Sequence, residues 1–156
     1  MNNTGMKVTF IYHSGFAVEL KNHIILFDYF KGRLPDFDLD KELLIFASHF
    51  HRDHFSRKVL ELKKNHPKVR YFFTKDIRRR IPKEEQTSDI VFLGKRDLYE
   101  QEDLRIKTLR STDEGSAFLV ECEGKVLYHA GDLNWWHWEE ESVRYNACLL
   151  YTSRCV

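Results

Sequence analysis

Apolar and polar residues alternate along the first part of the chain in the pattern of short β-strands. Large apolar residues occupy every second position between residues 7 and 13, which predicts a strand. A second strand is predicted over residues 17–20 and a third over residues 23–27, after a tight hairpin turn. The third strand ends at Asp28, so a carboxylate stands where a buried strand emerges. Residues 29–41 are acidic and rich in turn formers, which predicts a loop.

A continuous apolar run over residues 43–47 predicts a strand that is buried on both faces. Ser56 is a good N-cap for a helix that carries one apolar stripe and ends near Asn65. Residues 69–73 form the next predicted strand, and this strand–helix–strand order favours parallel pairing. Further strands are predicted over residues 89–93, 104–109, 116–122 and 125–129.

Composition limits the classes of partner. The chain has 156 residues, a length that predicts a single domain with a substantial core. Its formal net charge of +1 means that no global field draws nucleic acid or an anionic membrane to it. The N-terminal residues lack the layout of a signal peptide, and no apolar run is long enough to span a bilayer. The 3 cysteines show no ligand-like spacing, which fits a reducing cytoplasm.

The segment that follows the buried strand concentrates metal-binding side chains. His49, His51, Asp53 and His54 lie within six positions of one another. Imidazole and carboxylate groups suit zinc, iron or manganese, and a short loop after a buried strand can aim several of them at one point. His49 and His51 can share one ion, while Asp53 and His54 can serve a second. A purely structural zinc site is disfavoured because such sites usually use thiolates, and a surface histidine cluster without metal is the remaining alternative.

A second element of the predicted site follows the strand over residues 125–129. Gly131 permits close backbone approach, and Asp132 then places a carboxylate on the loop. A carboxylate in that position can bridge two metal ions about 3.5–4 Å apart.

These motifs carry a resemblance to a known family. The run His49-x-His51-x-Asp53-His54, followed by His129-Ala130-Gly131-Asp132, resembles the metallo-β-lactamase fold superfamily. The segments His13-Ser14-Gly15-Phe16 and Leu26-Phe27-Asp28 are similar to that superfamily's opening strands. The resemblance extends over most of residues 6 to 145 and is nearer to the ascorbate-phosphate-lactonase-like and uncharacterised bacterial branches than to the true lactamases.

The resemblance implies an α/β (α+β) fold, an αββα sandwich of mixed sheets with few helices, of which this chain holds mainly the N-terminal half. It implies that His49 and His51 bind a first metal, that Asp53 and His54 bind a second, and that Asp132 bridges the two. Asp28 would orient the histidine loop from behind. The implied activity is metal-dependent hydrolysis of an ester, lactone or phosphoester, with Asp53 acting on the attacking water and two zinc ions as the expected cofactors.

Two departures from the family pattern qualify this expectation. The superfamily normally has a further histidine where this chain has residues 111–115, and Asp113 or Glu114 could replace it, favouring manganese or iron. The superfamily's last histidine ligand has no counterpart after Asp132. Residues 1–146 are therefore interpreted as an incomplete domain and residues 147–156 as a non-native or read-through tail. An incomplete domain would expose apolar sheet surface and self-associate.

Other functions remain open from the sequence alone. One is a non-catalytic domain whose metal site has decayed, and another is an RNA or DNA phosphodiesterase of the same fold. The basic cluster formed by residues 75–80 with Lys83 could hold phosphate, although nearby acidic residues favour a solvated helix face. The aromatic segment 134–138 suggests either a wall for an organic substrate or a plug against other protein surface. A small-molecule substrate is the expected partner.

Overall fold

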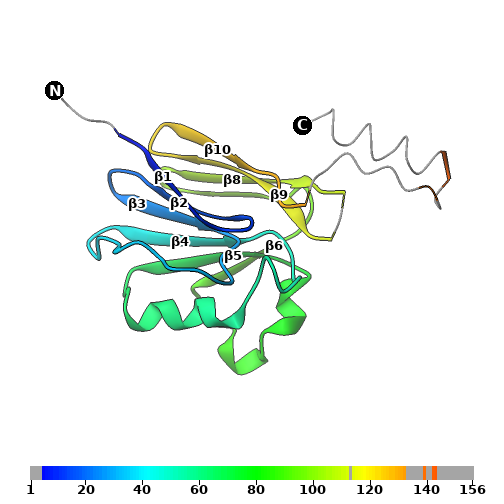
Figure 1. The fold of residues 1–156 in the computed structure, drawn as a ribbon, viewed down its shortest axis with the longest axis horizontal. Coiled ribbons are helices and arrows are strands. Elements are labelled where there is room, and N and C mark those ends of the chain that lie inside the picture. Colours follow the sequence, from blue (N-terminus) through cyan, green and yellow to red (C-terminus); the bar gives the residue numbers. More distant parts are fainter. Residues whose placement is uncertain (1–4, 113, 133–138, 140–141, 144–156) are drawn as a thin grey trace.

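Two stacked β-sheets form the body of the protein, and short helices cover the outer face of the larger sheet (Figure 1). The computed structural model describes residues 5–112, 114–132, 139 and 142–143. The first sheet has six strands in sequence order: β1 (Lys7–Tyr12), β2 (Gly15–Glu19), β3 (His23–Phe27), β4 (Glu42–Ala47), β5 (Val69–Thr74) and β6 (Ile90–Leu93). The second sheet has four: β7 (Leu98–Gln101), β8 (Leu104–Arg110), β9 (Ser116–Cys122) and β10 (Lys125–His129).

The first sheet changes from antiparallel to parallel pairing at its centre. Strands β1, β2 and β3 pair antiparallel, whereas β3, β4, β5 and β6 pair parallel. Parallel pairing places the carboxyl ends of β3, β4 and β5 at one edge of the sheet. The second sheet is antiparallel throughout. The sheet-rich, mixed architecture predicted from the sequence is therefore confirmed.

Strand β4 is buried on both faces, as its continuous apolar run predicts. Leu44 and Phe46 pack into the core between the two sheets, while Leu43 and Ile45 pack into the core under the helices. Phe46 is fully buried, and its ring centroid lies 5.0 to 5.2 Å from those of Phe27, Phe72 and Phe118. The two cores thus share β4, which fixes the position of the loop that leaves it.

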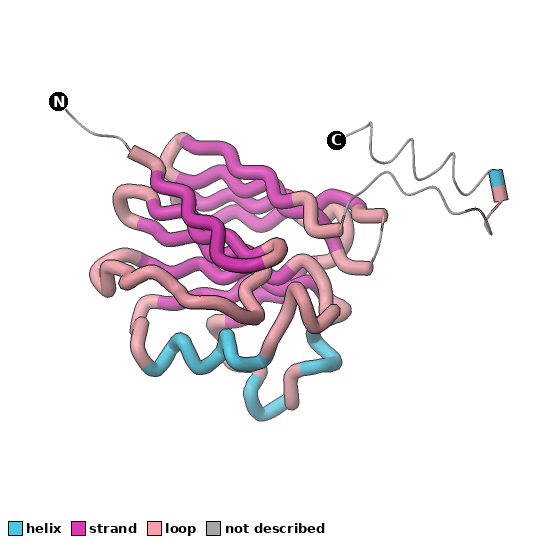
Figure 2. The backbone as a smooth tube through the Cα atoms, viewed as in Figure 1, coloured by secondary structure: helices cyan, strands magenta, loops and turns pink. Residues whose placement is uncertain are grey.

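The helices of this layer are 3₁₀ helices, a type that the apolar periodicity of the sequence does not specify. The layer consists of three 3₁₀ helices: η1 (Arg57–Lys64), η2 (Ile77–Arg80) and η3 (Lys83–Glu85), drawn as the helical segments in Figure 2. Helix η1 begins after Ser56 as predicted, but Val59 N–H donates to Ser56 C=O in the i to i+3 pattern. A 3₁₀ helix rises about 2.0 Å per residue against 1.5 Å in an α-helix, so η1 spans more of the sheet with the same residues.

Strand β7 was not predicted, because its sequence lacks the alternation that marks a half-buried strand. It is a short edge strand whose residues are mostly exposed, and it pairs with β8 through a turn at Glu102, where φ is +52°. The predicted strand over residues 17–20 begins two residues earlier, at Gly15.

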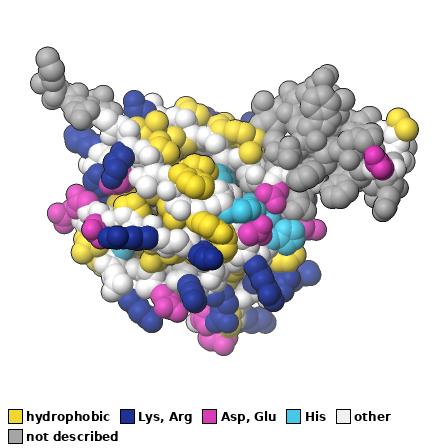
Figure 3. Space-filling model, viewed as in Figure 1, with side chains coloured by type: hydrophobic (Ala, Val, Ile, Leu, Met, Phe, Trp, Pro, Cys, Tyr) yellow, Lys and Arg dark blue, Asp and Glu magenta, His cyan; other side chains and the backbone are white. Residues whose placement is uncertain are grey.

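Large apolar side chains are exposed on the two strands β1 and β10. They are Val8, Phe10, Tyr12, Val126 and Tyr128, with exposed fractions between 45% and 64%. Figure 3 shows apolar side chains gathered on the face seen in Figure 1. Self-association through this surface stays a prediction. No helix in the described part of the chain is long and apolar enough to cross a membrane.

We expect Phe46→Ala to lower the free energy of unfolding by about 3–5 kcal/mol, because it opens a cavity where three other aromatic rings meet. Urea unfolding followed by circular dichroism measures this. Val126→Ala is the control, since Val126 is 64% exposed and its truncation should change stability by less than about 0.5 kcal/mol. Equal effects of the two substitutions would contradict the shared core described here.

Candidate metal centre

The register between β3 and β4 positions the candidate site. Phe27 on β3 lies opposite Phe46 on β4, and Asp28 N–H donates to Phe46 C=O at 2.9 Å. Asp28, the residue after β3, therefore stands beside Ser48, the first residue after β4. Ala47 and Ser48 are buried, so the histidine run that follows starts from a rigid base.

Asp28 is a fully buried carboxylate that accepts hydrogen bonds from three other residues. Ser48 donates its backbone N–H to Oδ1 and its hydroxyl to Oδ2, both at 2.7 Å. His54 Nδ1 and His129 Nε2 each lie 2.7 Å from Oδ2. A buried charge is tolerated only when it is paired and hydrogen-bonded, and these contacts meet that requirement. The orienting position predicted for Asp28 agrees with this geometry.

The hydrogen bonds around Asp28 also assign the ring nitrogens of two predicted ligands. Since Asp28 can only accept, His54 carries its proton on Nδ1 and presents Nε2 to the site. The Ser48 hydroxyl donates to Asp28, so it accepts from His49 Nδ1 at 3.0 Å, and His49 likewise presents Nε2. One carboxylate thus orients two imidazoles, in the arrangement that metal-binding histidines commonly show.

Charges inside this network shift its pKa values in different directions. Burial alone would raise the pKa of Asp28, but the charge and hydrogen bond of His129, together with those of His54, hold it far below its usual range. Burial lowers the pKa of His54, yet its hydrogen bond to Asp28 and the charges of Asp28 and Asp132 raise it above 6.5 overall. Burial and the charge of His54 hold the pKa of His49 below its usual value, which favours the neutral imidazole that a metal requires.

The structure brings three predicted ligands together at the end of the sandwich. His49, His54 and Asp132 each offer a ligand atom within 4.8 Å of the others. Asp132 Oδ1 lies 3.0 Å from His54 Nε2, and Asp132 Oδ2 lies 3.5 Å from His49 Nε2. One carboxylate oxygen facing each imidazole is the geometry expected of a bridging residue, the role that the family resemblance implies for Asp132.

A second group of ligand atoms shares His54. It adds Asp53 and His13, again with ligand atoms within 4.8 Å of one another. Asp53 Oδ2 lies 3.9 Å from His54 Nε2 and 3.7 Å from His13 Nε2. His13 belongs to the segment that resembles the superfamily's opening strands and was not among the ligands predicted from the sequence. Its φ of +54° turns it across the loop towards His54, a feature that no local sequence pattern signals.

The remaining predicted ligands are not gathered as closely. His51 belongs to neither group within the described residues, although its ring lies 4.6 Å from that of His49. Glu114 is exposed and is also outside both groups. Asp113 lies outside the described residues, as do the aromatic segment 134–138 and the predicted tail 147–156. The ligand role of Asp113 stays a prediction.

Two glycines allow the loop after β8 and the loop after β10 to approach the histidine run. A Cβ on Gly115 would lie 1.8 Å from Ser48 O, and one on Gly131 would lie 2.9 Å from Ser48 Cβ. Both have positive φ, at +73° and +58°. The sequence signalled Gly131 through its place before Asp132, but Gly115 and Ser48 were missed because their contact joins distant segments.

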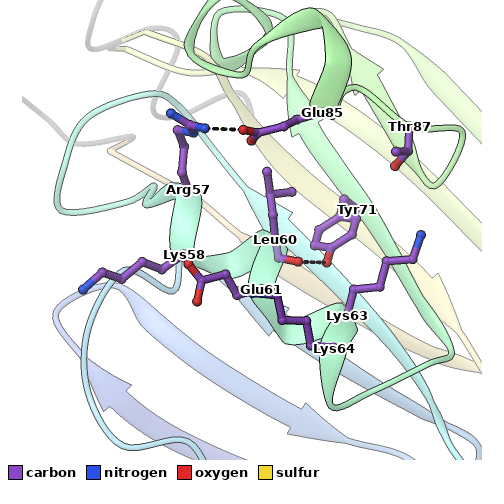
Figure 4. Close-up of a pocket in the computed structure, with 9 residues that line it drawn as sticks. All are labelled: Arg57, Lys58, Leu60, Glu61, Lys63, Lys64, Tyr71, Glu85 and Thr87. Atoms are coloured by element: carbon purple, nitrogen blue, oxygen red, sulfur yellow. Dashed lines mark hydrogen bonds and ion pairs between the residues drawn. The ribbon is translucent and has the colours of Figure 1, made fainter.

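A cavity of about 460 Å³ lies elsewhere, beside η1, and it contains none of the predicted ligands (Figure 4). Figure 4 shows Arg57 paired with Glu85 at one side and the Tyr71 hydroxyl donating to Leu60 C=O. These groups satisfy one another, so we assign the chemistry to the histidine-rich end of the sandwich instead.

We expect Asp28→Asn to lower the free energy of unfolding of the metal-free protein by about 3–5 kcal/mol at pH 7, because it leaves His54 and His129 without their buried anion. Urea unfolding measures this, with Asp36→Asn on the exposed loop as control. Because the pKa of Asp28 is lower in the folded protein than in the unfolded chain, where it is about 3.9, its charge stabilises the folded state above about pH 4. This stabilisation is lost as the pH falls further, so the difference in unfolding free energy between wild type and Asp28→Asn should shrink below about pH 4. A difference that grows on acidification would contradict this.

Similar proteins share this architecture. A metallo-hydrolase, Igni18 from Ignicoccus hospitalis, superposes with a TM-score of 0.62 at 21% identity, over 81% of this chain and 60% of that one. CmlA, a diiron β-hydroxylase from Streptomyces venezuelae, superposes with a TM-score of 0.59 at 16% identity, over 81% of this chain and 29% of that one. The chain thus spans less than two thirds of the length of these structures. No curated protein sequence matches it.

The family comparison extends over nearly all of the described residues. Residues 7–142 match the family described as the Beta-lactamase superfamily domain. That range includes both sheets, the histidine run and Asp132, and the fold neighbours carry the same two-sheet architecture. The chain therefore belongs to the β-lactamase superfamily domain family and has the metallo-β-lactamase fold.

Proposed function

We propose that this chain contributes the metal-binding end of a hydrolase that activates water against an ester, lactone or phosphoester. One observation carries the proposal. His54 is fully buried, donates through Nδ1 to Asp28, and presents to Asp132 an Nε2 atom that has no hydrogen-bond partner among the described residues. A buried imidazole nitrogen that points at a carboxylate oxygen, with a second imidazole beside it, is suited to hold a cation.

The residues present fit a metal ion. His49, His54 and Asp132 supply two imidazole nitrogens and a carboxylate, the donor set of catalytic rather than structural zinc sites. Asp53 and His13 supply a second, more exposed set around the same His54. Zinc is the metal we propose, with iron or manganese as alternatives because the donors are nitrogen and oxygen only. One structural relative is described as a diiron enzyme, which supports the iron alternative.

A metal ion held there would supply a bound water of lowered pKa and would polarise the oxygen of the scissile bond. The chain's own residues perform the positioning. Asp132 faces both imidazoles, and the Asp28 network keeps their Nε2 atoms turned into the site. Asp53 is half exposed, with 50% of its side chain accessible, so it can orient the water or accept its proton.

The free, buried thiol of Cys122 is consistent with the reducing cytoplasm that we propose as the compartment of this protein.

We expect Asp53→Ala to remove bound metal from the second group of ligands and to slow hydrolysis of generic esters or phosphodiesters by roughly 100-fold or more. Metal content by elemental analysis of the purified full chain and initial rates with such substrates measure the two effects. Asp36→Ala is the control, since it removes an exposed carboxylate that belongs to neither of these groups of ligand atoms. A variant that keeps both metal and activity would refute the proposed role of this site.

Metal binding should weaken as the pH falls, because the ion competes with the proton that the raised pKa of His54 retains. We expect the apparent affinity for zinc to drop roughly tenfold per pH unit for each proton displaced, beginning above pH 6.5. Titration calorimetry between pH 5.5 and 8, in buffers of different ionisation enthalpy, measures both affinity and proton release. Zinc binding with constant affinity and no proton release across this range would contradict the assignment of His54 as a ligand.

A further inference from the structure

A second cavity opens directly beside the histidine run. Its volume is about 590 Å³, within the range of small-molecule sites, and we call it the arginine pocket. Its lining residues are Phe50, His51, Arg52, Phe55, Arg57 and Arg80. The ring centroid of His51 lies 4.6 Å from that of His49, so the pocket adjoins the candidate metal centre.

The charge of the arginine pocket is entirely of one sign. Three guanidinium groups line it and no acidic residue does. Arg57 is paired with Glu85 at the edge, but Arg52 and Arg80 form no ion pair with any described residue. The chain as a whole has a net charge of only +1, so this is a local concentration of positive charge rather than a general property of the surface. Figure 3 shows Lys and Arg side chains beside the exposed histidine side chains on this face.

Stacking fixes the direction of one of these guanidinium groups. The Arg80 guanidinium carbon lies 4.4 Å from the centroid of the Phe50 ring. A guanidinium stacked on an aromatic face keeps its N–H edge available for a planar, bidentate contact with a carboxylate or phosphate. Phe50 is itself held in place, because its backbone N–H donates to Asp76 at 2.9 Å.

Two aromatic rings give the pocket an apolar part. Phe50 is partly buried and Phe55 is buried, with the Phe55 ring 5.3 Å from that of Phe73 in the core. A ligand that fits this lining has an oxyanion for Arg52 and Arg80 and an apolar portion for the rings. An extended polyanion such as RNA fits it less well, since the acidic Glu84 and Glu85 lie on helix η3 and would repel the neighbouring phosphates.

We propose that the arginine pocket binds the oxyanion of an organic substrate, so that this chain acts on small esters that carry a carboxylate or phosphate group next to an apolar portion. The substrate assignment rests on the proposed hydrolase function, whereas the binding of the anion does not. Arg52 and Arg80 hold the charged group, and His51 lies between it and the candidate metal centre.

The test uses the metal-free full chain, so that binding is separated from hydrolysis. Phenyl phosphate, benzoate and the neutral benzyl alcohol are titrated and followed by calorimetry or by ligand NMR. We expect one or both anions to bind, benzyl alcohol to bind at least roughly tenfold more weakly, and Arg80→Gln to weaken anion binding by roughly tenfold. Arg79→Gln is the matched control, because it makes the same charge change on helix η2 outside the pocket lining.

The two anions distinguish the oxyanion that the substrate carries. Preference for phenyl phosphate assigns a phosphate-bearing ester, and preference for benzoate assigns a carboxylate-bearing one. Binding of benzyl alcohol as tightly as the anions, or equal weakening by Arg79→Gln and Arg80→Gln, would overturn the proposal. Tighter binding of a single-stranded RNA oligonucleotide that depends on Arg79 as much as on Arg80 would also overturn it, in favour of a nucleic-acid surface.

Failure of the pocket and failure of the proposed function give different results. If the protein binds metal and loses it in Asp53→Ala, but shows no anion binding that depends on Arg80, the hydrolase proposal stands and the pocket assignment falls. If anion binding depends on Arg80 and the protein takes up no metal, the pocket stands and the hydrolase proposal falls.

Discussion

The candidate site depends on one buried carboxylate. Asp28 follows β3, and it gathers the backbone and hydroxyl of Ser48, the ring of His54 and the ring of His129 onto two oxygen atoms. Its negative charge is tolerated in the interior only because these donors form hydrogen bonds to it, and the same hydrogen bonds orient the donor side chains. The parallel pairing of β3 with β4 brings Asp28 and Ser48 side by side. The orientation of the histidine run therefore depends directly on the pairing of these two strands.

Much of the fold follows from local patterns in the sequence. The strands over residues 23–27, 116–122 and 125–129 have the bounds that alternation and turn residues predict, and the apolar run over residues 43–47 is buried between two cores. The helix after Ser56 was predicted from an apolar stripe, which locates a helix but does not distinguish α from 3₁₀ winding. Strand β7 escaped prediction because an exposed edge strand has no buried face to leave a pattern.

The sequence predicted the site residues that lie close together along the chain, but not those that reach the site from distant loops. The histidine run and the Gly131-Asp132 pair pointed to His49, His54 and Asp132, and the structure brings these three together. Gly115 and His13 reach the same region from other loops, through backbone conformations with positive φ that leave no periodic signal. The basic segment before Lys83 was interpreted as a solvated helix face, yet its last arginine, Arg80, turns onto Phe50 beside His51.

The contact between Asp28 and His129 has a consequence for the order in which the protein forms. It joins residues 101 positions apart, and a ribosome adding about 5–20 residues per second needs roughly 5–20 s to produce the second after the first. Until then Asp28 lacks the donor that His129 supplies in the folded protein. The candidate metal centre is therefore complete only when strand β10 has docked, because His129 ends that strand and Asp132 follows it.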